Sequence, residues 1–331
     1  MISESTRKVE SATDTSSSVI HVAPAPHLSH TSITTRRMMI DVLIGLMPVV
    51  IMSVCLFRGY AVKQILICLA GCLTAEVLFV WMRKKPLSLM DFSAAVTALI
   101  LALSLPGTAP WYIGVIASFT AIGIGKVLFG GLGMNIFNPA MVGRAFVMIA
   151  FAGAMAASGY ESATGGVDVI SQATPMDAFK QSGNVPPLGA LFWGMTNGSL
   201  GETSAIACLI GGIYLCLRRT ASWEIPAGII LSVVVIGAIQ NIISPESGWT
   251  VLHHVFGGAL LFGAFFIATD PVTSPVTPKG KWVFGIGVGF LVMVLRLFSG
   301  YPEGVMFAVL IMNAVTPLIN QKFIPEPFGG F

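Results

Sequence analysis

The sequence predicts an all-α integral membrane protein with about ten transmembrane helices. Of its 331 residues, 55% are hydrophobic and only 10% are charged, and the mean hydropathy is +0.84. Soluble domains carry about 25% charged residues. Apolar runs of roughly 20 residues, the length that a bilayer core requires of a helix, recur along most of the chain. The runs are continuous rather than alternating, which favours helices over a closed barrel.

The positions of the apolar runs predict ten spans in two membrane halves. They cover residues 38–57, 62–82, 91–105, 110–129, 139–157, 203–217, 223–243, 250–268, 281–298 and 303–320. The third and sixth are short, so they either extend into adjacent loops or are broken helices of the kind that line transporter sites. We therefore expect a disordered cytoplasmic tail (1–35), a five-span half (36–157), a loop (158–202), a second five-span half (203–320) and a C-terminal tail (321–331).

The distribution of Lys and Arg predicts the orientation. With the N-terminus in the cytoplasm, twelve basic residues lie on the cytoplasmic side and three on the other, which is the bias that positive charge follows in membrane proteins. The twelve are Arg7, Lys8, Arg36, Arg37, Arg83, Lys84, Lys85, Arg218, Arg219, Lys279, Lys281 and Lys322; the three are Arg58, Lys63 and Lys180. Both termini are then cytoplasmic, and residues 158–188 face the periplasm or the cell exterior.

A weak internal repeat accompanies this layout. Residues 91–146 and 264–318 each start near an Asp, pass a helix opened by Trp and reach an Asn followed by Pro; the residues are Asp91, Trp111 and Asn138, and Asp270, Trp282 and Asn313. Because each half has an odd number of spans, a duplication makes the halves inverted, and the site is expected where they meet.

Several function classes are excluded by the residues available. The net charge of +3 comes from Lys and Arg scattered at helix ends, so we expect no nucleic acid as a partner. The five cysteines lie inside apolar runs without a CxxC pair, which predicts no metal site. A hydrolase triad is implausible, since no His is near the polar loop at 158–188. The cysteines are Cys55, Cys68, Cys72, Cys208 and Cys216, and the histidines are His21, His27, His30, His253 and His254.

Two polar stretches are candidates for a site within the membrane. GGLGMNIFNPAMVGRAF (130–146) breaks the helix between the fourth and fifth spans, and such backbone lines protein or a cavity at this depth. Its Asn135 and Asn138 offer donors and acceptors to a heterocycle, or they are helix caps of a plain turn. The second stretch lies within residues 256–282. In it, Phe262 and Phe266 share a helix face, and Asp270 follows a few residues later. They predict a hydrophobic constriction with a cation-attracting mouth, the alternative being ordinary packing.

Two further candidates are a buried acid and a loop hydroxyl. Glu76 lies near the middle of the second span, where an ionisable group faces a cavity or an ion path, or is a structural hydrogen-bonded carboxyl. In the loop VDVISQATPMDAF (167–179), Asp168, Ser171 and Thr174 are spaced at i, i+3 and i+6. Without a nearby base, Thr174 is either a hydroxyl that another enzyme modifies or part of an ordinary polar loop.

These stretches together resemble one family. The pattern D-x-x-S-x-A-T, here Asp168, Ser171, Ala173 and Thr174, resembles an acceptor motif for FMN attached to threonine through a phosphoester. PHLSHTSITTRRMMIDVLIGLMP (26–48), GGLGMNIFNPAMVGRAF, FIATDPVTSPVTPKGKW and YPEGVMFAVLIMNAVTPL (301–318) resemble the membrane subunits RnfD and NqrB of ion-pumping redox complexes. The short N-terminal tail is more like RnfD. Gln172 departs from the family motif, which has Gly there.

The resemblance implies a function. It implies an electron-transfer subunit of a translocase that links ferredoxin and NAD to Na⁺ or H⁺ transport, carrying covalent FMN on Thr174. Its expected partners are iron–sulfur and flavin subunits of an Rnf-type complex, a flavin transferase and the lipid bilayer. By similarity to NqrB, Asn135 and Asn138 match positions that contact a non-covalent riboflavin, and Phe262, Phe266 and Asp270 match an ion constriction. Two alternatives stay open: an NqrB-like quinone reductase subunit, and a flavin-free transporter or channel.

Overall fold

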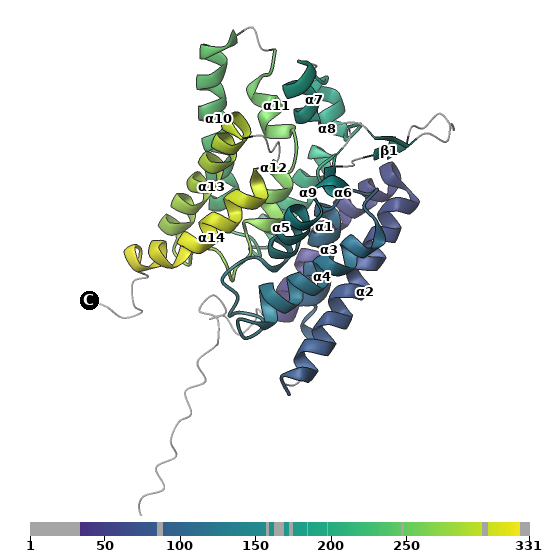
Figure 1. Cartoon of the computed structure of the whole chain (residues 1–331). Coiled ribbons are helices and arrows are strands. Elements are labelled where there is room, and N and C mark those ends of the chain that lie inside the picture. The colour runs from purple at the N-terminus through teal and green to yellow at the C-terminus, as the bar shows by residue number, and fades with distance from the viewer. Residues whose placement is uncertain are drawn as a thin grey trace, which may run out of the picture.

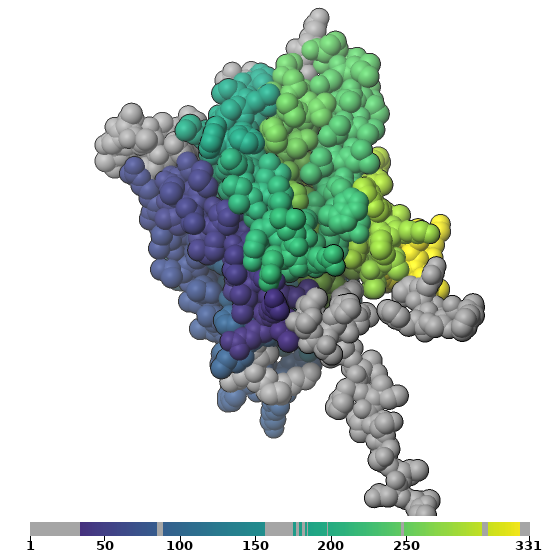
Figure 2. Space-filling model, turned by 180° about the vertical axis from the view of Figure 1, so that it is seen from behind, coloured from purple at the N-terminus to yellow at the C-terminus, as the bar shows by residue number. Residues whose placement is uncertain are grey.

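The chain folds into a bundle of helices in two groups that lie side by side. The computed structural model describes residues 34–84, 89–156, 159–161, 169–171, 175–183, 185–196, 198–245, 248–299 and 304–324. Figure 1 shows the helices of the first half (purple to teal) beside those of the second half (green to yellow), with α7, α8, α11 and β1 gathered at one end. We call this the loop end. From behind, Figure 2 shows the two halves meeting along a continuous seam.

Helices lie at the positions of the ten predicted spans within the described residues. The predicted fifth span (139–157) is not one continuous helix: α5 ends at Ala150 because Phe151 leaves the helical conformation, with φ of −131°. The first half consists of α1 (Thr35–Phe57), α2 (Gly59–Met82), α3 (Ser93–Ser104), α4 (Trp111–Ile122), extended by a π turn at Gly123–Val127, and α5 (Pro139–Ala150). The second half consists of α9 (Ala205–Leu217), α10 (Glu224–Ile243), α11 (Val251–Phe256) with α12 (Leu260–Phe262) and a π turn at Gly263–Ile267, α13 (Pro278–Phe298) and α14 (Val305–Lys322).

Short elements connect the halves. They are α6 (Ala152–Ala156), β1 (Gly159–Glu161), β2 (Val169–Ser171), α7 (Pro175–Ser182) and α8 (Leu188–Trp193). The two strands pair antiparallel, with Gly159 opposite Ser171. They form a small hairpin outside the helical bundle, so the fold remains that of an all-α membrane protein.

The distribution of polar and apolar side chains is that of a protein in lipid. Five helices (α1, α2, α10, α13 and α14) are long and apolar enough to cross a membrane. Large apolar side chains on their outer faces are exposed, among them Leu66, Ile242 and Phe298, while Glu76 and Lys126 are buried inside the bundle. An apolar exterior around a polar interior is the arrangement expected when the solvent is hydrocarbon.

The third and sixth spans are short, as predicted, and irregular backbone completes them. At 1.5 Å per residue, the 12 residues of α3 and 13 of α9 reach about 20 Å, less than a bilayer core of about 30 Å. The segment before α9 runs beside the end of α3: Leu200 N donates to Leu105 O at 3.2 Å and Gly201 N to Leu103 O at 2.7 Å. These hydrogen bonds satisfy backbone groups that lipid cannot satisfy.

The eighth span differs from the expectation of one continuous helix. It ends at Phe256 and restarts at Leu260, because Gly257 and Gly258 interrupt it and Gly258 has φ of 67°, a conformation that favours glycine. Hydropathy does not reveal this break, because the residues on both sides of it are apolar.

The packing order of the helices is similar in the two halves. In each half the second span packs most extensively on the fourth: α2 on α4 and α10 on α13. The fourth also packs on the fifth in each, α4 on α5 and α13 on α14. This order supports the predicted duplication. Asp91 and Asp270 are not equivalent in it, because Asp91 precedes the third span and Asp270 follows the eighth. The inversion and the orientation remain predictions.

The halves approach each other closely where α1 crosses α9. A Cβ atom added at Gly211 would clash with the backbone oxygen of Gly45. At the same crossing, Asp41 of α1 accepts hydrogen bonds from Tyr214 and Thr220 and pairs with Arg218 at 3.3 Å. The seam therefore depends on small residues and a polar clamp.

We expect Gly211→Ala to destabilise the protein by about 1–3 kcal/mol, because the backbone of α1 must move to admit the methyl group. The free energy of unfolding in mixed micelles measures this. Gly153→Ala is the matched control, since a Cβ at Gly153 meets nothing within 4 Å. Equal stability of the two variants would contradict the close crossing.

Candidate functional site between the two halves

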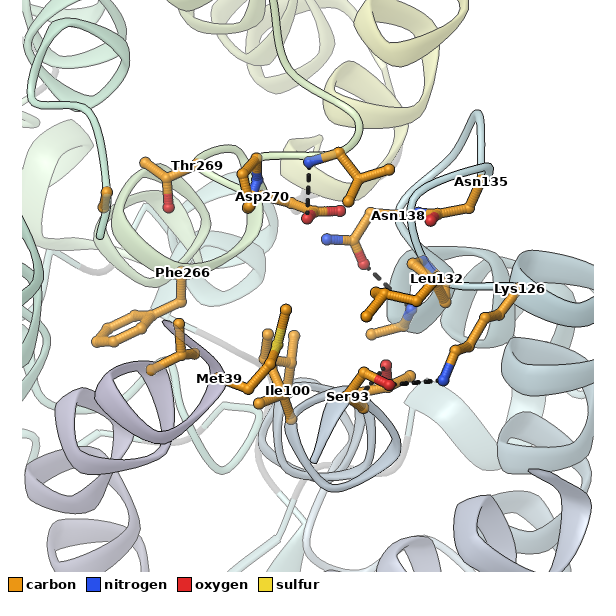
Figure 3. Close-up of a pocket in the computed structure, with 18 of the residues that line it drawn as sticks. Met39, Ser93, Ile100, Lys126, Leu132, Asn135, Asn138, Phe266, Thr269 and Asp270 are labelled. Carbon is orange, nitrogen blue, oxygen red and sulfur yellow. Dashed lines mark hydrogen bonds between the residues drawn. The ribbon is translucent and has the colours of Figure 1, made fainter. Parts of the chain in front are cut away.

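A pocket of about 70 Å³ lies between the two halves. We call it the interface pocket. Its walls come from α1, α3, the π turn at 123–127, the 130–140 segment, α9 and the segment at 266–272. Of the residues singled out in the sequence, it brings together Asn135, Asn138, Phe266 and Asp270 (Figure 3). The two polar stretches at 130–146 and 256–282, more than 100 residues apart, therefore form one site.

Asn138 ties the two halves to each other at this pocket. Its Oδ1 caps α5 by accepting from Ala140 N at 3.1 Å, and its Nδ2 donates to Ile267 O at 3.3 Å. Its own N–H donates to Asn313 Oδ1 on α14 at 3.2 Å. All polar atoms of its side chain are thus engaged by protein. Asn138 acts both as the helix cap and as a cross-half link.

The aromatic pair lies as its spacing predicts. The rings of Phe262 and Phe266 are 5.5 Å apart, and both side chains are buried, at 0% and 3% exposure. Phe266 lines the interface pocket, whereas Phe262 lies behind it, toward the loop end of the same span. The π turn at Gly263–Ile267 carries Phe266. Single π turns inside helices occur frequently at functional sites.

Asp270 lies in the turn that follows the eighth span and lines the pocket. Its Oδ1 accepts from Val272 N at 3.3 Å and its Oδ2 from Thr273 Oγ1 at 3.1 Å. Burial raises the pKa of this carboxyl, and the two hydrogen bonds partly oppose the rise. The carboxyl therefore keeps a proton to higher pH than an ordinary Asp does.

Glu76 is joined to the pocket through a lysine. Lys126 Nζ lies 2.7 Å from Glu76 Oε1 and donates to Ser93 Oγ at 2.6 Å. The side chains of Lys126 and Glu76 are 3% and 1% exposed. Lys126 and Ser93 line the pocket, and Figure 3 shows the ammonium group directed at Ser93. The acid of the second span is thus half of a buried ion pair whose cation belongs to the pocket wall.

The pocket does not fit a riboflavin as it is folded. Its volume of about 70 Å³ is well below the roughly 300–1,000 Å³ of pockets that enclose ligands of this size. Asn138 offers at most the second hydrogen of its Nδ2 group, because its Oδ1 already accepts from Ala140 N and Met141 N. Asn135 donates to Phe137 O at 3.2 Å, and its buried Oδ1 has no hydrogen-bond partner among the described residues. A water or a small cation suits this single acceptor better than a flavin ring does.

The predicted flavin acceptor is in the loop, away from the interface pocket in sequence. Asp168, Ala173 and Thr174 lie outside the described residues, and Ser171 is the last residue of β2. Thr174 directly precedes α7, which begins at Pro175. The first turn of a helix presents free backbone N–H groups and a partial positive charge, which favour a bound phosphate.

The sequence alone assigns no site role to three polar residues at or beside the pocket: Lys126, Ser93 and Asn313. Lys126 is a basic residue near a span end, where positive charge is common, and nothing in its spacing identifies Glu76, 50 residues earlier, as its partner. Asn313 belongs to the sequence pattern only as part of the repeat. In the fold it donates to Thr273 O at 3.1 Å and helps to hold the 266–273 segment against α14.

A two-half helical bundle with apolar membrane-length helices, buried ion pairs and a small pocket at the seam defines a class, that of polytopic membrane proteins. Residues 21–329 match the NQR2, RnfD, RnfE family. The chain belongs to this family of membrane subunits.

Relatives with assigned names cover nearly the whole chain. It is 37% identical over 313 residues to the D-type subunit of the Na⁺-translocating ferredoxin:NAD⁺ oxidoreductase complex of Acetobacterium woodii, covering 93% of this chain and 95% of that protein. It is 37% identical over 327 residues to the D-type subunit of the proton-translocating complex of Clostridium ljungdahlii, covering 94% and 96%. The D-type subunit of the ion-translocating oxidoreductase complex of Stutzerimonas stutzeri is 38% identical over 325 residues, covering 88% and 92%.

Proposed function

We propose that this protein is the RnfD-type subunit of a complex that couples electron transfer between ferredoxin and NAD⁺ to cation transport. Family membership and relatives of matching length with this assignment support the proposal. The other subunits bring the ferredoxin- and NAD-binding sites, because the sequence carries neither a dinucleotide fingerprint nor cluster-binding cysteines. This protein acts as an electron carrier and ion conduit within the assembly.

The carrier is FMN joined to Thr174 through a phosphoester. The residues that support this are Asp168, Ser171, Ala173 and Thr174 in the acceptor pattern, together with the position of Thr174 immediately before α7. A flavin, when bound, exchanges one or two electrons and so connects one-electron and two-electron partners. The first turn of α7 stabilises the phosphate, and the covalent bond retains the group on an exposed face. Attachment requires a flavin transferase.

The interface pocket is the cation-binding part. Asp270 supplies a carboxylate, and Asn135 supplies a carbonyl oxygen that has no hydrogen-bond partner among the described residues; Thr269 and Ser93 lie in the same wall. Phe262 and Phe266 close the apolar side toward the loop end. A small, mostly apolar pocket that offers a few oxygen atoms beside an aromatic constriction suits a partly dehydrated cation. Glu76 contributes indirectly, by holding Lys126 in place.

Na⁺ and H⁺ are both compatible with this pocket. The two relatives named for Na⁺ and for protons are each 37% identical to the chain, so similarity does not separate the two ions. Because the pKa of Asp270 is raised, a proton displaces a metal cation as pH falls through that raised value. We expect the apparent affinity for Na⁺ to decrease toward acidic pH, and to lose this dependence in Asp270→Asn.

The acceptor motif separates this function from its alternatives. If the protein were a flavin-free transporter, the acceptor pattern at 168–174 would have to be a coincidence. An NqrB-like quinone reductase subunit would keep the flavin but occur beside quinone-reactive subunits, which neighbouring reading frames reveal. The observation that carries the proposal is the acceptor motif within a chain of this family.

The test is the covalent flavin itself. The protein is expressed with a flavin transferase, purified, boiled in SDS and viewed under ultraviolet light after electrophoresis. We expect yellow-green fluorescence in its band. A known flavinylated protein, expressed under the same conditions, serves as the positive control. If that control fluoresces and the band of this protein does not, the flavin-carrying function is rejected.

A further inference from the structure

The helix that follows Thr174 is attached to the second membrane half, although it follows the first half in sequence. In α7, the ring of Phe179 lies 4.5 Å from that of Trp249, and the two ring planes are tilted by 30°. Lys180 Nζ donates to Ser299 O, after the end of α13, at 2.9 Å. Figure 1 shows α7, α8 and α11 together at the loop end. The segment after the flavin acceptor thus rests on the eighth and ninth spans.

The start of the eighth span is held by the loop at three places. Trp249 packs on Phe179, His253 Nε2 donates to Pro186 O at 3.0 Å, and Phe256 lies 5.7 Å from Phe192 of α8. Trp249 is central among them. Its ring also lies 5.0 Å from that of His253, and it is only 2% exposed although it precedes the helix. A displacement of α7 is therefore resisted by α11 directly.

The same span continues from these contacts to the interface pocket. After α11 the chain breaks at Gly257–Gly258, where Arg296 donates to His254 O and, at 2.8 Å, to Gly257 O. It resumes in α12 and the π turn, and Asp270 follows. Glycines and π turns are places where a helix changes direction. The segment from Trp249 to Asp270 joins the two sites and contains both.

We propose that Trp249 is a positioning residue that couples the flavin-bearing segment to the cation pocket. It fixes α7 on α11, so that a movement of the flavin segment passes along the eighth span to Phe266 and Asp270. Close-packed side chains transmit such displacements because they leave no space to absorb them. The inference rests on the proposed function, in which Thr174 carries the flavin and the interface pocket the cation.

The test uses the intact complex in sealed vesicles with Trp249→Leu and Trp249→Phe. Three quantities are measured: in-gel covalent flavin, quenching of that flavin by iodide, and cations moved per ferredoxin oxidised, with Na⁺ and pH followed together. In Trp249→Leu we expect covalent flavin as in wild type, stronger quenching, and a cation-to-electron ratio lowered about threefold or more, a size typical of coupling between sites. Trp249→Phe keeps an aromatic ring in contact with Phe179, so its iodide quenching and its cation-to-electron ratio should both be close to those of wild type.

A second variant approaches the contact from α7. Phe179→Leu should produce the same two changes as Trp249→Leu. The double variant should be little more affected than either single variant, because both substitutions remove the same Phe179–Trp249 contact. Trp81→Leu in α2 is the matched control: this Trp is 73% exposed and is expected to have no effect on either quantity.

The outcomes distinguish the two claims. A wild-type band without fluorescence overturns the proposed function and this inference with it. A fluorescent wild type combined with an unchanged ratio and unchanged quenching in Trp249→Leu and Phe179→Leu overturns the inference alone. Equal loss of the protein from the complex in Trp249→Leu and Trp249→Phe, with a normal ratio in Phe179→Leu, assigns Trp249 to folding and also overturns it.

Discussion

Thr174→Ala is expected to abolish covalent flavin completely while leaving the protein in the membrane. The methyl side chain has no oxygen to form the phosphoester, and no other group replaces it. Because Thr174 belongs to none of the ten spans, the amount of protein should stay near that of wild type. In-gel fluorescence and an immunoblot of the same gel measure both quantities.

The matched control for this change is Thr164→Ala. Thr164 is a threonine of the same loop that lies outside the acceptor pattern. It should retain full fluorescence. Gln172→Gly, which creates the family pattern, should load at least as well as wild type. Fluorescence that survives in Thr174→Ala, or disappears in Thr164→Ala, would move the attachment to another residue.

Lys126→Met is expected to cause the largest loss of stability of the changes considered. The substitution leaves the Glu76 carboxylate without its ammonium partner at 1% exposure. Removing one partner of a buried ion pair costs about 3–5 kcal/mol, because a charge remains in a low-dielectric interior. The free energy of unfolding in mixed micelles should fall by this amount, and membrane insertion with it.

The double variant Lys126→Met with Glu76→Gln separates charge from packing. With both charges removed, most of the lost stability should return, since a neutral pair of similar volume is tolerated at such sites. Lys63→Met, on an exposed face of α2, is the control for loss of a lysine and should change little. A double variant as unstable as Lys126→Met would show that the pair is not held together by charge.

The restored double variant also reports on function. If Lys126 only fills space, the complex with both changes should transport cations at the wild-type ratio. If its charge shapes the interface pocket, the variant should be stable but altered in its apparent affinity for Na⁺ or H⁺. Transport in vesicles at varied Na⁺ and pH distinguishes the two.

The fold was largely predictable because a bilayer imposes a strong length and polarity constraint on each helix. The ten spans and the short third and sixth helices follow from that constraint. The break at Gly257–Gly258 does not, because its flanking residues are as apolar as those of an intact helix. It depends on backbone conformation and on Arg296, which donates to two carbonyls there.

The site was predictable in its parts but not in its assembly. Asn138, Phe266 and Asp270 were singled out from local pattern, and they share one pocket. The pairing of Glu76 with Lys126 could not be derived, because it joins α2 to the π turn after α4 through packing that no sequence period records. The helix-cap role of Asn138 was one of the two interpretations of the sequence, but its link between the two halves appears only when α14 is placed beside α5.

The most direct test of the account is simultaneous measurement of electron transfer and cation transport by the complex in sealed vesicles. Reduced ferredoxin is added to vesicles that hold the wild-type protein or Thr174→Ala, and NAD⁺ reduction, Na⁺ movement and pH are followed together. The account predicts that wild type reduces NAD⁺ and moves cations in proportion, and that Thr174→Ala does neither. Cation transport at the wild-type ratio in Thr174→Ala would contradict it.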